Sequence, residues 1–136
     1  MHWSERFVGL PFVAGGRDSA GVDCWGLVTM VYRDVANIHL DPLTGRYITA
    51  EEREDIARIV EGEVAHGPWV RVEAGDEHEL DVALFRCFGL QSHVGVICGR
   101  GVMLHASIGH ESRIERYTDS RWILRFQSAW RHKSRL

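Results

Sequence analysis

The sequence predicts an α+β protein in which helices pack on one face of an antiparallel sheet. Its 136 residues, of which 45% are hydrophobic and 26% charged, are typical of one globular domain over residues 1–136. The hydrophobic period changes from helical spacing before Gly67 and Pro68 to alternation after them. Helical segments followed by a run of strands are characteristic of the α+β class.

Three helices are expected in the first half of the chain. A short amphipathic helix is predicted over residues 2–9, and turn formers predict a loop over 11–22. The next helix, 23–36, has Asp23 as a suitable N-cap residue and apolar residues at helical spacing. The third begins at a capping box, Thr49 to Glu52, and its apolar stripe ends at Val64.

The second half predicts five or six strands, each with alternating apolar residues. A meandering sheet of these strands, together with the helices, can bury a usable core at this length. The predicted strands are 69–73, 81–86, 92–98, 102–107, 112–117 and 123–130.

Composition excludes several functional classes. The net charge of −3 argues against a nucleic-acid binder, which would show a basic excess. No apolar run approaches the roughly 18 residues of a membrane span. The apolar stretch 7–14 is short, contains Gly9 and Pro11, and follows Glu5, so it is a poor signal peptide. We therefore expect synthesis in the cytoplasm without export by the standard route.

Cys24 is the first candidate for chemistry, because it lies in the first turn of the predicted helix 23–36. A helix N-terminus stabilises a thiolate and is expected to lower the pKa of the thiol. A free cysteine is more often a small buried apolar residue. That second reading is favoured for Cys87 and Cys98, which lie in strand-like segments.

His93 and His105 are linked by the register of a predicted hairpin. With a three-residue loop over 99–101, Cys98 would pair with Val102. The two histidines then become diagonal neighbours on one face that otherwise carries small residues. The opposite face of the hairpin is apolar and is predicted to be core.

Three readings of the histidine pair follow. One histidine can act as a base for a thiol while the other orients it, the pair can bind a metal, or both can be ordinary structural histidines. A zinc site of one cysteine and two histidines lacks a fourth ligand at motif spacing. A metal site is therefore the least favoured of the three readings.

Four motifs in order, the first of them made of two segments, resemble the NlpC family of peptidoglycan cysteine peptidases. Segments 9–16 (GLPFVAGG) and 21–28 (GVDCWGLV) are similar to the family's opening. Segments 81–85 (DVALF), 92–97 (SHVGVI) and 102–106 (VMLHA) are similar to three of its strands. The resemblance covers most of the chain and implies a minimal papain-like fold, with a helix-borne cysteine packed against a sheet that carries histidine.

The resemblance implies a role for each matching residue. Cys24 would be the nucleophile, His93 the general base, and His105 the residue that orients the base, with the Cys24 amide in the oxyanion hole. The implied reaction is hydrolysis of an amide bond in the peptidoglycan stem peptide, typically between D-glutamate and diaminopimelate, and it implies neither a metal nor an organic cofactor. Ser92, beside the base, is expected to contact substrate.

Two positions depart from the family pattern. Phe12 replaces a tyrosine and Trp25 replaces a serine, so of the three side chains that bind a free stem amine in bacterial members only Asp23 remains. Phe12, Asp23 and Trp25 are still expected to line the substrate site. The resemblance therefore leaves open a change in the bond or stem that is recognised.

The sequence is most similar to the phage-tail members of the family. The segment 25–28 (WGLV) and the pairs Tyr32-Arg33, Arg46-Tyr47 and Glu51-Glu52 fit that subset. This implies partners in a phage or phage-like tail and action at the cell wall as part of that particle. A structural tail-tip subunit with little activity and an amidase on the same scaffold are the alternatives.

Overall fold

The computed structural model describes residues 2–42, 67–87, 90–118 and 121–136. The expected helix that starts at Thr49 lies outside these residues. The elements are η1 (Trp3–Phe7), β1 (Arg17–Asp18), β2 (Gly21–Val22), α1 (Cys24–Ala36), β3 (Trp69–Val72), β4 (Val82–Cys87), β5 (Leu90–Gly99), β6 (Val102–Ser107), β7 (His110–Arg116), β8 (Phe126–His132) and η2 (Lys133–Arg135).

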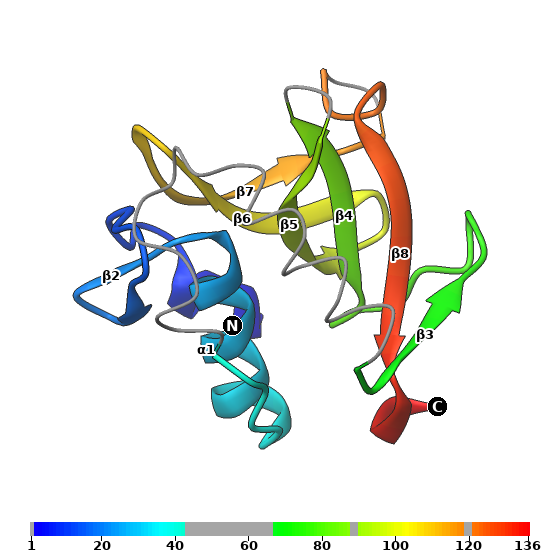
Figure 1. The fold of residues 1–136 in the computed structure, drawn as a ribbon, viewed down its shortest axis with the longest axis horizontal. Coiled ribbons are helices and arrows are strands. Elements are labelled where there is room, and N and C mark those ends of the chain that lie inside the picture. Colours follow the sequence, from blue (N-terminus) through cyan, green and yellow to red (C-terminus); the bar gives the residue numbers. More distant parts are fainter. Residues whose placement is uncertain (1, 43–66, 88–89, 119–120) are drawn as a thin grey trace.

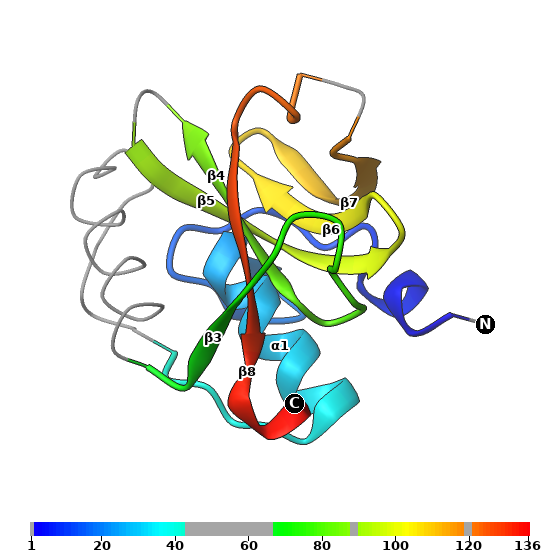
Figure 2. The same ribbon diagram turned by 90° about the vertical axis from the view of Figure 1, so that its right-hand side faces the viewer.

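The main sheet has six antiparallel strands in the order β3-β8-β4-β5-β6-β7. It is strongly twisted, so that β6 and β7 cross the direction of β4 and β8 (Figure 1). Helix α1 packs beside the sheet, and the view after a 90° turn places it behind the strands (Figure 2). The α+β prediction is confirmed, with each of the six expected strands present.

The N-terminal third differs from the sequence-based expectation in two places. The predicted helix over residues 2–9 is a five-residue 3₁₀ helix, η1. It ends at Phe7, because the backbone is extended at Val8 and Gly9 adopts a positive φ of 89°. The predicted loop 11–22 contains the two short strands β1 and β2.

No helix among the described residues is long and apolar enough to cross a membrane.

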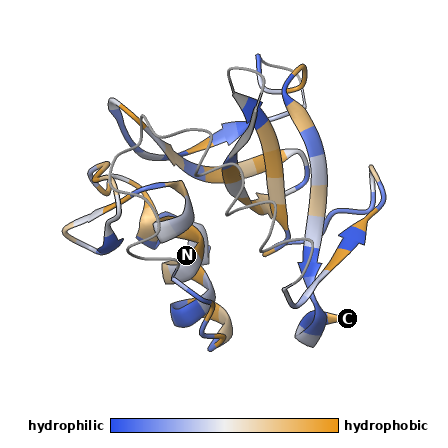
Figure 3. Ribbon diagram, viewed as in Figure 1, coloured by the Kyte–Doolittle hydropathy of each residue, from blue (hydrophilic) through white to orange (hydrophobic). Residues whose placement is uncertain are grey.

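Two apolar clusters occupy the two faces of the sheet. The larger lies between α1 and the sheet, and includes Leu27, Val31, Val94, Val96 and Leu104. This matches the apolar face predicted for the hairpin of β5 and β6. Hydrophobic residues concentrate on β4, in the middle of the sheet, whereas β7 at its edge is hydrophilic (Figure 3).

The second cluster lies on the other face of the sheet, which also carries His93 and His105. Its buried members are Ala83, Phe85, Ile97, Met103, Tyr117, Trp122 and Ala129. The expectation that this face carries only small residues is wrong, because aromatic side chains from β4 and from the segment after β7 cover it. The histidine pair is therefore buried in the structure.

The turn between β5 and β6 also differs in detail from the prediction. Val96 pairs with Leu104 and Ile97 with Met103, which is the predicted register. An irregularity after Ile97 then makes Gly99, rather than Cys98, the partner of Val102. The extra residue shifts only the end of the hairpin. The body of the hairpin keeps the register on which the histidine argument depends.

Candidate active site

Cys24 is the first residue of α1, and Asp23 is its N-cap. Asp23 has an extended backbone, and its carboxylate accepts a hydrogen bond from the backbone N–H of Gly26 at 2.8 Å. The thiol of Cys24 is half-buried. Because the first amides of a helix have no acceptor within it, the N–H of Cys24 itself is a candidate donor to a developing oxyanion.

The thiol of Cys24 has a raised pKa, contrary to the prediction from its position at a helix N-terminus. Burial raises this pKa to about 12, and the charge of Asp23 adds to the shift. Hydrogen bonds from the backbone of Val94 and Trp25 and the charge of Arg17 act in the opposite direction. The thiol is therefore protonated at neutral pH and needs a base to react, and its hydrogen bond from the backbone of Val94 places it against β5, the strand that carries His93.

His93 and His105 are joined by a hydrogen bond. Nε2 of His93 lies 2.9 Å from Nδ1 of His105, with the two rings nearly perpendicular. His93 is 6% exposed and His105 is fully buried. The predicted diagonal contact across the hairpin is confirmed. This bond engages one nitrogen of His93 and leaves Nδ1 for other chemistry.

Trp122 covers the histidine pair from the segment between β7 and β8. Its ring stacks on His93, with centroids 4.9 Å apart and an interplanar angle of 21°, and meets His105 edge-on at 5.1 Å. The side chains of Arg121 and Arg125 lie over the same indole at 5.6 and 5.5 Å. Trp122 thus fixes the plane of His93 and excludes water from that side.

Glu115 on β7 extends the chain of contacts beyond His105. Its Oε1 atom lies 2.9 Å from Nε2 of His105 and 3.3 Å from Nε of Arg113. Pairing of Met103 with Glu115 and of His105 with Arg113 makes Glu115 a diagonal neighbour of His105 on the same face. Sequence reasoning missed Glu115. The register between β6 and β7 was the signal that could have found it.

Burial and nearby charges keep both histidines neutral. The pKa of His93 is well below its ordinary value, first because of burial, then because a second proton on the coupled His105 and the charges of Arg113 and Arg125 would repel a proton on His93; the carboxylate of Glu115 partly opposes this. Burial, followed by Arg113, lowers the pKa of His105 to about 3. The site therefore holds a protonated thiol next to neutral imidazoles, the starting state for general-base activation of a thiol.

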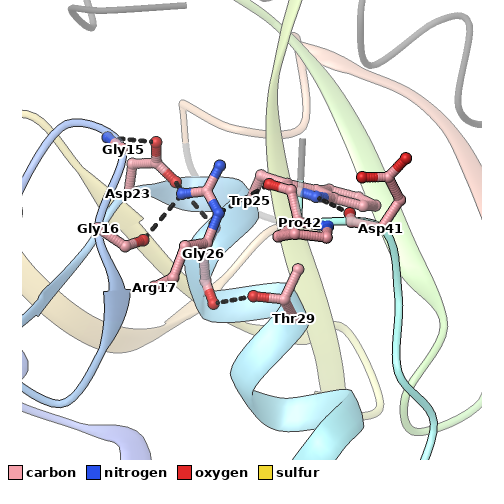
Figure 4. A network of polar contacts seen from close by, with 9 residues as sticks. All are labelled: Gly15, Gly16, Arg17, Asp23, Trp25, Gly26, Thr29, Asp41 and Pro42. Atoms are coloured by element: carbon pink, nitrogen blue, oxygen red, sulfur yellow. Dashed lines mark hydrogen bonds and ion pairs between the residues drawn. The ribbon is translucent and has the colours of Figure 1, made fainter. Parts of the chain in front are cut away.

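Asp23 is held by its own segment of the chain (Figure 4). Oδ1 accepts from Nη1 of Arg17 at 2.7 Å as well as from Gly26, and Oδ2 accepts from the N–H of Gly15 at 2.9 Å. The carboxylate is 5% exposed and that arginine side chain 14%. The negative charge of Asp23 is thus neutralised inside the protein.

Arg17 and the glycines around it fix the shape of this network. Nη1 of Arg17 also donates to the carbonyl of Gly16, and Nε donates to the carbonyl of Pro42, each at 2.8 Å. A Cβ atom on Gly26 would lie 1.9 Å from the carbonyl oxygen of Gly16, so only glycine fits there. The start of α1 is locked onto β1 by these contacts.

The remaining expected substrate residues lie around α1 and on β5. Trp25 is 1% exposed, and its indole N–H donates to the carbonyl of Asp41 at 2.9 Å. Phe12 is half-buried against the larger cluster and forms a bridge with Val22. Ser92 lies in β5, but its side chain is outside the described part of the structure. Within the described ranges, no group of three or more His, Cys, Asp or Glu residues could hold a metal ion.

Comparison with known proteins places this geometry in a family. Residues 9–131 match the model of the NlpC/P60 family. A search of curated proteins finds no match. Among solved structures, an NlpC/P60 family protein from Bacillus cereus is 20% identical over 95% of this chain and 37% of its own, with a TM-score of 0.70.

Two further solved structures share the fold. The NlpC/p60 domain of the peptidoglycan hydrolase SagA is 20% identical over 93% of this chain and 90% of its own, with a TM-score of 0.61. NlpC1 from Trichomonas vaginalis is 20% identical over 96% of this chain and 41% of its own, with a TM-score of 0.66. The chain thus spans less than half of two of these proteins. The predicted papain-like fold class is confirmed.

Proposed function

Because this chain belongs to the NlpC/P60 family, we propose that it is a peptidoglycan hydrolase, a cysteine peptidase that cleaves an amide bond of the stem peptide. One observation carries the proposal: β5 carries His93, whose ring is hydrogen-bonded to His105 at 2.9 Å, and the backbone of its next residue, Val94, hydrogen-bonds to the thiol of Cys24. The SagA domain, a solved neighbour with the same fold, is itself named as part of a peptidoglycan hydrolase.

The geometry supports a two-step acyl transfer. Nδ1 of His93 takes the proton from the thiol of Cys24 as the sulfur attacks the carbonyl carbon of the stem amide. A C–S bond forms, and the N–H groups at the start of α1 stabilise the oxyanion. His93 then gives its proton to the leaving nitrogen as the C–N bond breaks.

The second step restores the enzyme. A water molecule gives a proton to His93 and attacks the carbonyl carbon of the thioester. The C–S bond breaks, the carboxylic acid product leaves, and the proton returns from His93 to the sulfur of Cys24. Both steps need a neutral His93 at the outset, which its depressed pKa supplies.

The finer assignment is the bond between D-glutamate and diaminopimelate, with the protein carried in a phage or phage-like tail. The support is the sequence resemblance of the segment 25–28 and of the pairs Tyr32-Arg33 and Arg46-Tyr47 to tail-associated members. In this role the protein is made in the cytoplasm, assembles with tail proteins and opens the wall locally. Mass spectrometry of purified phage or phage-like particles tests the tail role. Consistent absence of this chain from such particles would contradict that role.

Digestion of purified diaminopimelate-type peptidoglycan tests the activity and the bond together. Mass spectrometry of the soluble products should find a new amine on diaminopimelate and a new carboxylate on D-glutamate. A new amine on L-alanine would instead identify an amidase that cuts the link between sugar and peptide. If the folded protein releases nothing, the hydrolase proposal is wrong and the structural tail-tip role is favoured.

A further inference from the structure

The family resemblance names Cys24, His93 and His105. The structure adds a fourth side chain, Glu115, which is hydrogen-bonded to His105. We propose that Glu115 is a positioning residue that sets the protons on His105 and His93, so that Nδ1 of His93 is left unprotonated and can serve as the base for Cys24. The inference concerns the proton arrangement of the free protein, and it rests on the proposed function only for its effect on catalysis.

The direction of each hydrogen bond follows from the acceptor at the end of the chain. An ionised carboxylate can only accept, so Nε2 of His105 must carry a proton to bond with Oε1 of Glu115 at 2.9 Å. A neutral His105 then has a bare Nδ1, which accepts from Nε2 of His93 at 2.9 Å. Neutral His93 is left with its lone pair on Nδ1. One carboxylate therefore determines both tautomers.

Arg113 holds the carboxylate in place. Its Nε lies 3.3 Å from Oε1 of Glu115, and its Nη1 donates to Oγ of Ser107 at 3.2 Å. Oε1 of Glu115 is thereby fixed between a cation on its own strand and His105 on β6. The side chain of Glu115 is 27% exposed, whereas that of His105 is fully buried. Glu115 could pair with Arg113 at the surface without touching His105. Its additional contact with the buried ring therefore indicates a role at the histidine pair.

Glu115 also acts on His93 through its charge. When His93 accepts the thiol proton it becomes a cation, and the carboxylate beyond His105 favours that state. The charges of Arg113 and Arg125 oppose it at His93, and those of Arg113, Arg121 and His110 oppose protonation of His105. Glu115 raises the pKa of His93, whereas the nearby arginine side chains lower it.

Removal of Glu115 should leave the fold intact, but the protons of His105 and His93 would no longer be confined to Nε2. Without the acceptor, His105 can place its proton on Nδ1 and donate to His93, which then presents a protonated Nδ1 to Cys24. We expect Glu115→Ala to lower kcat about 10- to 100-fold with a smaller change in KM, by analogy with the loss of a carboxylate that orients a metal-ligating histidine. Glu115→Gln keeps an acceptor oxygen and should retain an intermediate rate.

Nitrogen-15 NMR of the histidine rings tests the proposal in the full chain without substrate. Both His93 and His105 should carry their proton on Nε2 in the wild type, and this pattern should be lost or mixed in Glu115→Ala. The matched control is Glu111→Ala, an exposed acidic residue on the same strand, which should keep wild-type tautomers and kcat.

Two results would overturn the role of Glu115. One is a wild-type tautomer pattern in Glu115→Ala, and the other is an equal loss of kcat in Glu111→Ala. If the wild type shows the expected tautomers but releases nothing from peptidoglycan, the hydrolase proposal fails while the positioning role stands. If Glu115→Ala does not fold, the tautomers and the pH profile of Glu115→Gln decide. The glutamine substitution removes the charge, so the acid limb of the pH profile should move to lower pH.

Discussion

At the start of α1 the carboxylate of Asp23 accepts three hydrogen bonds from its own segment, whereas on β7 the carboxylate of Glu115 bonds across the sheet to His105. Asp23 is adjacent to Cys24 in sequence, and its bonds hold the helix start against Arg17. Glu115 is distant in sequence from Cys24, and its bond sets the state of two histidines. Proximity in sequence to the proposed nucleophile therefore does not decide which carboxylate contacts the histidine pair.

The largest expected effect is on the histidine side. His93→Ala removes the proton acceptor, and we expect hydrolysis to fall at least about 100-fold, the lower end of general-base contributions. His105→Asn keeps a hydrogen-bonding side chain and should retain more rate than His105→Ala. Muropeptide release measures the rates, and thermal melts report folding. Equal rates in the two His105 variants would contradict the orienting role.

On the Asp23 side we expect the main effect to be on stability. Asp23→Ala removes the N-cap of α1 and leaves the largely buried charge of Arg17 without this partner. The free energy of unfolding should drop by about 3 kcal/mol, more than the usual cost of a lost cap. Asp18→Ala, at an exposed residue of the neighbouring β1, is the control and should cost less than about 1 kcal/mol. If Asp23→Ala has the wild-type free energy of unfolding, the proposed difference between Asp23 and Glu115 is wrong.

Acid should destabilise the histidine side of the protein. His93 and His105 have pKa values below the ordinary 6.5 in the folded state. The unfolded chain therefore binds more protons below pH 6.5, and stability falls as the pH drops from there towards the folded-state values. The loss approaches about 1.4 kcal/mol per pH unit for each histidine. Urea melts between pH 7 and 5 measure this slope, which should be smaller in His105→Asn. A slope unchanged by that substitution would contradict burial of neutral His105.

The smallest expected effect concerns the stem peptide. Because Asp23 is neutralised by Arg17, Trp25 is buried and Phe12 lacks a hydroxyl, this side of the site offers little to a free stem amine. Intact stems should be cleaved at least as fast as stems trimmed to a free L-alanine amine. Competition between the two substrates measures the ratio. A preference of more than about 10-fold for trimmed stems, or 1.4 kcal/mol, would refute it.

Local patterns were enough to predict the elements that carry the site. The N-cap at Asp23, the bounds of α1, and the body of the hairpin that joins His93 to His105 all follow from residues close together in the sequence. Such features depend on capping, periodicity and turn length, which act over a few residues. The resemblance of the motifs, in their order along the chain, to the NlpC family predicted the papain-like fold.

The features that sequence reasoning missed depend on contacts between distant segments. Trp122 reaches His93 from beyond β7, and Glu115 reaches His105 only because β7 pairs with β6. The pKa of Cys24 was predicted in the wrong direction, because burial, followed by the charge of Asp23, raises it more than the backbone hydrogen bonds and Arg17 lower it. Burial is a property of the whole fold, so the local position of Cys24 could not supply it.

The central claim is that Cys24, activated by His93, hydrolyses peptidoglycan. The most direct test is release of muropeptides from purified peptidoglycan by the wild type and by Cys24→Ala, compared at a temperature where both are folded. Cys98→Ala is the matched control, because Cys98 is a buried cysteine of the larger apolar cluster. The account predicts release by the wild type and by Cys98→Ala and none by Cys24→Ala. Release by Cys24→Ala at the wild-type rate would contradict it.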